Sequence, residues 1–252
     1  GRYVFIQDNS GIYRFEPGEH LGDFPFACAA GVAGDSSAQQ HQSNPGCSRV
    51  CPAGYSCGAG TFDPIACENG TFCPIGSLTT QDCPAGRVGM RSLLASADDC
   101  EICPNGTRCA KGAAKVELCG VGTFAPMPES EDCTHCETGK YQNIPGQNGC
   151  NLCAKGKHAN VTGQTVCQNC TAGYEAINTG ETDCFACYVG RFSVEGDPSG
   201  CHDCPQGHFS LYNASTGCTA CSEGQFYTGG DEACTECAAG MYAPNKGQVN
   251  CT

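Results

Sequence analysis

The sequence predicts a small disulfide-rich fold: an elongated linear array of short disulfide-stapled β-hairpin repeats, with little helix and no large core. The chain of 252 residues contains 26 cysteines and 35 glycines. Leu, Ile, Val and Phe together make up only about 14 % of it, below the roughly 20 % that normally buries enough apolar surface to offset the entropy of folding. The cysteines are even in number and regularly spaced, as in small extracellular modules that replace a core with cross-links.

Residues 1–46 are expected to form an N-terminal β-hairpin followed by a polar loop. The runs GRYVFIQ and GIYRFEP are rich in β-prone residues, and AAGVAGDSSAQQHQSNPG is small and polar. We expect the apolar side chains of the hairpin either to pack on the first cysteine module or to contact a neighbouring molecule. The residues assigned to self-association in the second case are Tyr3, Phe5, Ile12, Tyr13 and Phe15.

Residues 47–132 are expected to form irregular cysteine-rich modules. Three segments, CPAGYSC, CENGTFC and CPNGTRC, place two cysteines close together, and longer loops separate the others. The spacing predicts disulfides between Cys28 and Cys47, Cys51 and Cys57, Cys67 and Cys73, Cys83 and Cys100, Cys103 and Cys109, and Cys119 and Cys133. A crossed alternative, with Cys100 joined to Cys109 and Cys103 to Cys119, also fits locally but leaves Cys83 and Cys133 unpaired.

Residues 133–252 contain a regular repeat in which CxxC pairs recur at steps of 17 residues and once of 16. A glycine follows the second cysteine by three residues and an aromatic residue usually comes two residues later. In most repeats a second glycine lies four residues before the next cysteine. Glycine at these places favours tight turns with positive φ, so each repeat is predicted to be a two-stranded hairpin. The fixed period indicates an array in which each unit mostly contacts its neighbours.

The number of cysteines at the end of the array indicates which cysteines are joined by disulfides. Because the chain closes on a single Cys251, the arrangement without an unpaired cysteine joins the second cysteine of one pair to the first of the next. The predicted bridges are Cys136 to Cys150, Cys153 to Cys167, Cys170 to Cys184, Cys187 to Cys201, Cys204 to Cys218, Cys221 to Cys234, and Cys237 to Cys251. Each bridge is expected to enclose one hairpin, and a loop of about 15 residues contributes about 3 kcal/mol by restricting the unfolded chain.

The CxxC pairs have a second interpretation, because C-x2-C-x13-C-x2-C lies near the spacing of a zinc ribbon. Tetrahedral sites use these pairs two at a time and would leave Cys251 over, so we expect no metal and no cofactor. No Ser/His/Asp motif, phosphate-binding glycine loop or pair of catalytic carboxylates stands out, so we expect no catalytic residues and no enzymatic activity. His135 and His202, inside CxxC pairs, are expected to be exposed loop residues.

Composition also bears on partners and compartment. With 13 basic and 26 acidic residues the formal net charge is -13, which argues against nucleic acid and anionic membrane surfaces as partners. The cysteine content predicts an extracellular or cell-surface protein of the secretory pathway. No run approaches the about 18 apolar residues of a membrane helix. Since the sequence begins with neither Met nor an apolar leader, we expect a mature or partial chain.

Six N-x-[ST] sequons agree with an extracellular location and predict N-linked glycans. They lie at Asn69, Asn105, Asn160, Asn169, Asn213 and Asn250. Asn169 and Asn250 have cysteine in the middle position of the sequon, and we expect these two to be used less often if that cysteine is already bridged.

At the level of the unit C-x2-G-x-[YF]-x(n)-G-x3-C-x2-C, the chain resembles the ephrin-receptor-like cysteine-rich repeat family and, more distantly, the first loop of tumour necrosis factor receptor modules. The segments that carry the resemblance are CETGKYQNIPGQNGC, CSEGQFYTGGDEAC and CAAGMYAPNKGQVNC, and it covers roughly residues 51–251. The resemblance implies extended, disulfide-laddered, extracellular rods. A fold of this kind does not by itself fix a function.

Two functions are compatible with these features. The first is an extracellular glycosylated structural or adhesive rod that self-associates into a filament, coat or surface appendage, with copies of itself or other extracellular matrix or surface proteins as partners. The uniform period and the lack of a pocket-forming core favour it. The second is a receptor-like ectodomain whose repeats bind a protein or glycan ligand. Its candidate sites are two basic clusters, Arg108, Lys111 and Lys115 in one repeat and Lys155, Lys157 and His158 in another.

Overall fold

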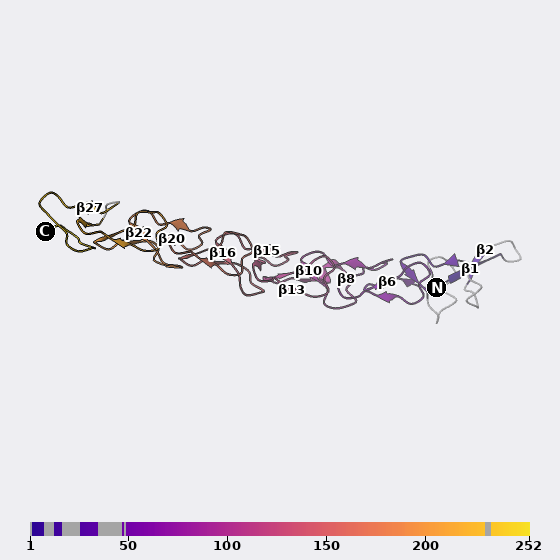
Figure 1. Ribbon diagram of the computed structural model, residues 1–252. Coiled ribbons are helices and arrows are strands. Elements are labelled where there is room, and N and C mark those ends of the chain that lie inside the picture. The colour runs from indigo at the N-terminus through magenta and orange to yellow at the C-terminus, as the bar shows by residue number, and fades with distance from the viewer. Residues whose placement is uncertain (1, 8–12, 17–25, 35–46, 48, 230–232) are drawn as a thin grey trace. The chain divides into compact units, whose positions relative to one another are not determined.

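The computed structural model describes residues 2–7, 13–16, 26–34, 47, 49–229 and 233–252 (Figure 1). Apart from the first two strands, every strand in this part of the chain is two residues long, and the single helical element is the 3-10 turn η2 (Ala97–Asp99). No described helix is long and apolar enough to cross a membrane. The predicted fold class is confirmed: small antiparallel hairpins, held by disulfides, follow one another in a repeated array.

The N-terminal segment forms a three-stranded antiparallel sheet in the order β2-β1-β3. Strand β1 (Arg2–Gln7) pairs with β2 (Tyr13–Glu16), and Phe5 lies opposite Phe15, so the predicted hairpin is present. Strand β3 (Phe26–Ala27) pairs with the beginning of β1 on its other side. This sheet therefore leads directly into the first bridged cysteine, Cys28.

The rest of the described chain folds into two-stranded antiparallel sheets, each made of two consecutive strands. In chain order the pairs are β4 (Val32–Ala33) with β5 (Arg49–Val50), β6 (Tyr55–Ser56) with β7 (Ile65–Ala66), β8 (Thr71–Phe72) with β9 (Gln81–Asp82), β10 (Arg87–Val88) with β11 (Glu101–Ile102), β12 (Thr107–Arg108) with β13 (Glu117–Leu118), β14 (Thr123–Phe124) with β15 (Thr134–His135), β16 (Lys140–Tyr141) with β17 (Asn151–Leu152), β18 (Lys157–His158) with β19 (Gln168–Asn169), β20 (Tyr174–Glu175) with β21 (Phe185–Ala186), β22 (Arg191–Phe192) with β23 (His202–Asp203), β24 (His208–Phe209) with β25 (Thr219–Ala220), and β26 (Gln225–Phe226) with β27 (Thr235–Glu236). The glycine directly before the first strand of each pair has positive φ, and we call it the first glycine of its repeat.

The second strand of each regular hairpin lies inside a CxxC motif. In the repeat that begins at Cys136, β16 pairs with β17, which fills the two positions between Cys150 and Cys153. The bridge from Cys136 to Cys150 therefore ends just before the second strand. The expectation that one disulfide loop encloses a whole hairpin is wrong in this respect. The return strand is fixed at its two ends by two different disulfides, so each bridge serves two successive repeats.

Every cysteine in the chain is bridged, and the thirteen bridges join the pairs predicted from the spacing. The crossed alternative in the first half does not occur. Their Cα–Cα distances of 5.6–6.3 Å are normal for disulfides. Most of these cysteines are buried, and small clusters such as Cys153, Ala159 and Cys167 with Tyr141 take the place of a single core.

Each repeat is joined through its backbone to the repeat that follows. The N–H of Gly139, a first glycine, donates to the carbonyl oxygen of Ala159 in the next repeat at 2.7 Å. In return, the N–H of Gly163, at the turn of that next repeat, donates to the carbonyl oxygen of Cys136 at 2.8 Å. Equivalent bonds recur between most successive repeats. Hairpins that would be marginal alone in water are thus held by their neighbours.

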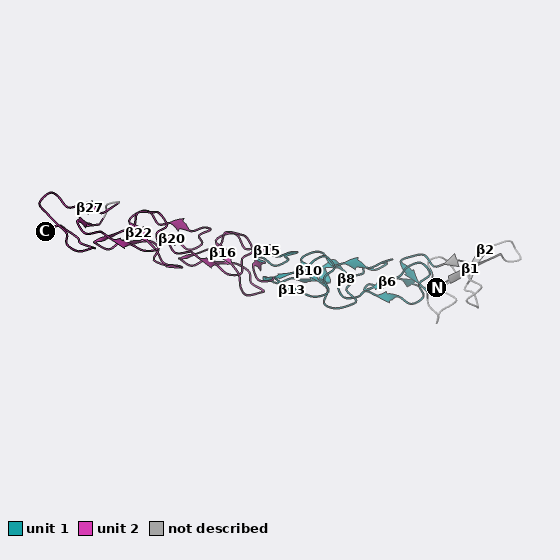
Figure 2. Ribbon diagram, viewed as in Figure 1, with its two compact units in different colours: residues 1–119, 125–133 teal, residues 120–124, 134–252 magenta. Residues whose placement is uncertain are grey.

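The chain divides into two compact units (Figure 2), unit 1 with residues 1–119 and 125–133 and unit 2 with residues 120–124 and 134–252. Both contain the same hairpin, but their bridges differ. In unit 1 a short bridge such as Cys51–Cys57 brings its second cysteine to the buried position directly after the first strand. In unit 2 small residues such as Ala159 and Ala176 fill that position, and the bridge spans the longer loop.

Candidate functional site

The most regular surface feature is the turn between the two strands of a repeat. Each described turn has a residue of positive φ in its middle; it is glycine in most repeats, Gly196 in the turn that also contains Gly200, and Leu93, Glu129 or Ala214 in three others. We call it the turn residue. In most repeats its N–H donates to a cysteine carbonyl oxygen of the preceding repeat, at 2.7 Å between Ala214 and Cys187. The turn is thereby fixed against the array.

In three repeats of unit 2 an aliphatic side chain lies two residues before the turn residue, whereas Asn178, Tyr212 and Asn245 take this position in three others. The aliphatic residues are Ile144, Val161 and Val194, which are 55 %, 55 % and 53 % exposed. We call these three residues the turn row. Met127 takes the same position in unit 1 and is also exposed. Exposed apolar surface is unfavourable by about 25 cal/mol per Å2, so its presence at the same position of several repeats marks these turns as candidate contacts.

The residues assigned to self-association from the sequence lie in the N-terminal sheet. Tyr3 and Phe5 are in β1, Tyr13 and Phe15 are in β2, and Ile12 lies outside the described residues. Because β2 and β3 already pair with the two sides of β1, a strand from a second molecule would have to pair with the outer edge of β2 or of β3.

The first basic cluster is partly neutralised within the protein: Arg108 and Lys111 have carboxylate partners, whereas Lys115 makes no ion pair with a described residue. The guanidinium of Arg108 lies 2.9 Å from the carboxylate of Glu117 and 2.8 Å from that of Asp132. The ammonium of Lys111 lies 3.7 Å from the carboxylate of Asp82. Two of the donor directions of Arg108 are thus already used, which leaves less capacity for an acidic ligand at this repeat.

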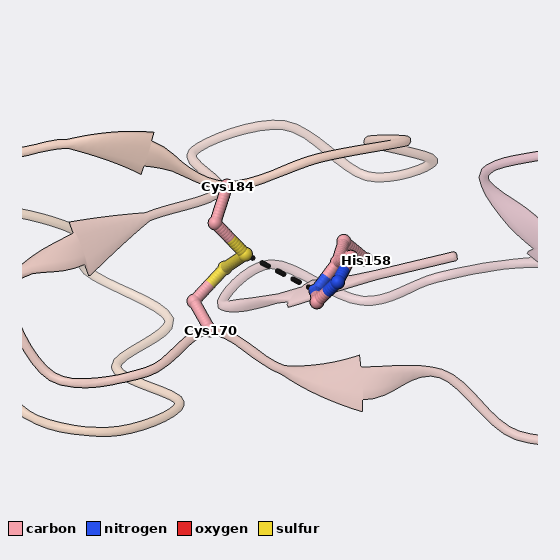
Figure 3. Close-up of side chains that lie close together, drawn as sticks. All are labelled: His158, Cys170 and Cys184. Atoms are coloured by element: carbon pink, nitrogen blue, oxygen red, sulfur yellow. Dashed lines mark hydrogen bonds between the residues drawn. A yellow bond between two sulfur atoms is a disulfide. The ribbon is translucent and has the colours of Figure 1, made fainter. Parts of the chain in front are cut away.

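The second basic cluster places His158 against a disulfide (Figure 3). Nδ1 of His158 lies 3.1 Å from Sγ of Cys184, which is bridged to Cys170. Among the described residues these three form the one group of potential ligand atoms close enough together for a metal ion. A metal takes thiolate sulfur, and both sulfur atoms are committed to the S–S bond. The bridged cluster therefore does not fit a metal centre.

The two histidines inside CxxC pairs are exposed, as expected, but they lie in strands β15 and β23 and not in loops. Nε2 of His202 lies 2.7 Å from Oδ2 of Asp197, and its ring centroid lies 5.9 Å from that of Phe192. The backbone N–H of Ser199 and then His202 lower the pKa of the Asp197 carboxyl. His135 lies in the exposed strand β15.

The six sequon asparagines are all exposed, but their carboxamides are held differently. Nδ2 of Asn69 donates to the carbonyl oxygen of Met90 at 3.2 Å. Oδ1 of Asn213 instead accepts from the N–H of Val189 at 3.1 Å. Within the described part of the chain the side chains of the other four sequon asparagines make no hydrogen bond. Among the six, only Asn213 has its carboxamide oxygen held by a hydrogen bond while Nδ2 has no partner in that part of the chain.

The turn row was not predicted from the sequence, because the repeats were compared only at their cysteines, glycines and aromatic residues. A signal was present: Ile144, Val161 and Val194 each lie two residues before a glycine of the turn. Its meaning depends on exposure, which a pattern of letters does not give. A comparison with protein-family models gives no match, and a comparison with curated proteins finds no significantly similar sequence.

Proposed function

We propose that this protein is an extracellular, glycosylated structural or adhesive protein that associates with copies of itself, as in a filament, coat or surface appendage. The observation that carries the proposal is the turn row, in which an aliphatic side chain is exposed at the same position of three repeats of unit 2. A surface with the period of the chain is best matched by a partner with the same period, and a second copy of the chain has it.

Energetics favour a contact made through several repeats at once. Full burial of one Ile or Val side chain contributes about 1.5–3 kcal/mol, whereas association costs about 4–15 kcal/mol in lost freedom of motion. A single turn therefore cannot hold two molecules together. The net charge of -13 also opposes close approach, so association should strengthen as salt screens the repulsion.

The chain's covalent chemistry supports an extracellular setting. Thirteen disulfides with no free cysteine are stable in oxidising compartments and are rare in the cytosol. All six sequon asparagines are exposed, which is compatible with glycosylation. The cysteine, glycine and aromatic spacing supports assigning the repeats to the ephrin-receptor-like type.

A receptor-like role is the second candidate, and one observation favours it. Lys155 and Lys157, in the same repeat, make no ion pair with any described residue, so their charges are available to an acidic ligand. The partly neutralised Arg108 makes the first basic cluster the weaker site. Lys155→Ala with Lys157→Ala would abolish binding to an acidic protein or glycan and leave self-association unchanged.

Self-association is tested on the unreduced protein by sedimentation velocity and negative-stain electron microscopy across a range of salt concentrations. The turn-row variant carries Ile144→Ser, Val161→Ser and Val194→Ser. A matched control carries Ile65→Ser, Leu118→Ser and Val166→Ser, at side chains that are 64–65 % exposed but lie outside the row. A third variant lacks residues 1–17, which tests the N-terminal sheet.

We expect the wild type and the matched control to form regular assemblies and the turn-row variant to remain a monomer. Loss of assembly only in the variant that lacks residues 1–17 would assign the contact to the N-terminal sheet instead. A wild type that stays monomeric at all salt concentrations would contradict the proposal. Since Asn160 adjoins Val161, glycan occupancy at Asn160 is measured on the same samples.

A further inference from the structure

Four exposed aromatic and aliphatic residues lie on the two chain segments that meet at one sequon of unit 2. Tyr188 and Tyr212 are 70 % and 73 % exposed, and Val189 and Leu211 beside them in the chain are also exposed. We call these four residues the tyrosine patch. A concentration of exposed apolar surface on a soluble protein usually marks a contact. We therefore expect another group to contact and cover the tyrosine patch.

Two hydrogen bonds bring the two halves of the patch side by side. The N–H of Val189 donates to Oδ1 of Asn213 at 3.1 Å. The N–H of Ala214 donates to the carbonyl oxygen of Cys187 at 2.7 Å. Residues 187–189 of one repeat therefore lie along residues 213–214 of the next, and each of the two tyrosines is a direct neighbour of a bonded residue.

Asn213, the asparagine of the sequon Asn-Ala-Ser, lies where these two segments meet. A backbone N–H can be accepted only by the carboxamide oxygen, so the bond from Val189 fixes which way the Asn213 side chain is turned. Nδ2, the atom that carries an N-linked glycan, is left without a partner among the described residues. At Asn69, in contrast, Nδ2 is turned toward the backbone carbonyl of Met90.

We propose that an N-linked glycan on Asn213 folds over the tyrosine patch and covers it. The inference rests on the proposed glycosylation of this protein. Attachment forms a bond from Nδ2 to C1 of N-acetylglucosamine, breaks the bond from that C1 to a lipid-linked diphosphate donor, and releases one proton from Nδ2. The C–H face of the sugar ring then packs on the tyrosine rings, whose faces carry partial negative charge, while the hydroxyl groups remain in water.

The occupant is the chain's own glycan because the attachment point lies within the patch. A tethered sugar is present at high effective concentration, so weak stacking is enough to keep it in place. The covered surface would then be unavailable for self-association.

The test uses the full chain secreted from eukaryotic cells. Asn213→Asp removes the sequon but retains an oxygen that accepts the N–H of Val189, and Asn160→Asp removes a sequon away from the patch as a matched control. Glycopeptide mass spectrometry measures the occupancy of each sequon. Hydroxyl-radical labelling measures the accessibility of Tyr188 and Tyr212, with the exposed Phe62 of unit 1 as an internal reference.

We expect Asn213 to be occupied and the labelling of both tyrosines to rise several-fold in Asn213→Asp and to stay unchanged in Asn160→Asp. Equal labelling of wild type and Asn213→Asp, with Asn213 occupied, would overturn the inference. An unoccupied Asn213 beside other occupied sequons would overturn it too, while glycosylation itself would stand. If no sequon is occupied, the proposed glycosylation fails together with the inference.

Discussion

A Cβ atom on Gly156 would lie 2.6 Å from the carbonyl oxygen of Gly196, in the turn two repeats further along the chain. The first glycine of a repeat thus packs against the backbone of the second repeat that follows, in addition to its bonds with the next one. The same relationship recurs within both units, between Gly31 and Gly76, Gly54 and Leu93, Gly70 and Gly112, Gly86 and Glu129, Gly122 and Gly163, Gly139 and Gly180, Gly173 and Ala214, and Gly207 and Gly247.

Substitution of a first glycine should therefore be costly for a reason beyond its φ. Gly156 has φ +75, and an alanine there would also meet the carbonyl oxygens of Gly196 and Asp197. Left-handed backbone costs about 1–2 kcal/mol for a residue with Cβ, and overpacking adds about 1–3 kcal/mol. We expect Gly156→Ala to speed amide hydrogen exchange at Gly196, whose N–H donates to Cys170, by a factor of 30 or more, about 2 kcal/mol.

Gly224 provides the matched control for this prediction. It is a first glycine with φ +81, but a Cβ there would meet nothing within 4 Å. Gly224→Ala should therefore cost only the backbone term of about 1–2 kcal/mol. Equal effects of the two substitutions would show that the contact between Gly156 and Gly196 contributes nothing to the array.

The turn residue should tolerate substitution better than the first glycine. A Cβ on Gly163, with φ +74, would meet Nδ1 of His135 at 2.9 Å, and that side chain can move. Ala214 already carries a Cβ at φ 60 in the corresponding position. We expect Gly163→Ala to cost about 1 kcal/mol of unfolding free energy. Ala214→Gly, which retains the sequon at Asn213, should stay within about 0.5 kcal/mol, because relieved strain offsets the greater freedom of the unfolded chain.

Calorimetry of the two variants and the wild type under non-reducing conditions checks this second prediction. For a chain of this length, 1 kcal/mol corresponds to a shift of about 2–4 °C in Tm. If Ala214→Gly destabilises as much as Gly163→Ala, the positive φ is not the property that selects glycine at the turn.

The first glycine and the turn residue show how much of the fold could be predicted from the sequence. Glycine at both positions predicts tight turns with positive φ, and the structure has positive φ at both. The two positions also differ in the sequence. The first glycine, as at Gly54 and Gly86, is glycine in every hairpin, whereas the turn position can hold another residue, such as Leu93 or Glu129. The first glycine is required because the backbone carbonyl of a turn two repeats away lies against it. A backbone contact of this kind leaves no pattern of residue types in the sequence. For this reason contact with the second neighbour was not predicted, while contact with the next repeat was.

The disulfides could be predicted from the sequence, but the register of the strands could not, because the register depends on backbone groups that every residue has. Counting cysteines from Cys251 leaves one pairing for the regular repeats, whereas the bridges of the first half were predicted from the spacing of their cysteines. The two residues inside each CxxC, such as Asn151 and Leu152, pair through their backbone groups with the strand after the first glycine. Their side chains vary from repeat to repeat, so nothing in their identity indicates a strand.

Reduction should abolish the fold rather than loosen it. The core consists mainly of bridged cysteines with small residues such as Ala159 between them. A bridge like Cys153–Cys167, with a sequence separation of 14, contributes about 3 kcal/mol by restricting the unfolded chain. We expect the dispersed amide signals of the NMR spectrum to collapse in a thiol reductant at neutral pH. A cooperative thermal transition that persists after complete reduction, verified by mass after alkylation, would contradict this expectation.

The removal of one bridge tests how far each repeat depends on the next. Cys153→Ala with Cys167→Ala frees the loop in which Gly163 forms the turn, and the carbonyl oxygen of Cys153 accepts the N–H of Gly180 in the following repeat at 2.8 Å. We expect faster amide exchange at both glycines and little change in unit 1, because coupling in a linear array falls off with distance along it. Uniform loss of protection throughout the chain would indicate one cooperative unit.

The carboxylate of Asp99 should make the segment before η2 sensitive to acid. Its Oδ2 accepts the backbone N–H of Ala95 at 3.0 Å, the N–H of Ser96 at 2.8 Å and the hydroxyl of Ser96 at 3.0 Å. These bonds, first the one from the Ser96 side chain and then those from the backbone, lower the pKa of Asp99 below its ordinary value of 3.8. All three favour the ionised form, because a protonated oxygen is a poor acceptor.

The sign of the pH dependence follows from this lowered pKa. The stabilisation is fully present above 3.8, where the carboxyl would be ionised even in the unfolded chain, and it is lost as the pH falls through the lower pKa of the folded protein. The amide resonances of Ala95 and Ser96, followed by NMR from neutral to strongly acidic pH, should titrate with a midpoint below 3.8. In Asp99→Asn, which keeps one acceptor oxygen but cannot ionise, the same resonances should show no such transition. A wild-type midpoint at or above 3.8, or an equal transition in Asp99→Asn, would show that these bonds are not what holds the loop before η2 in place.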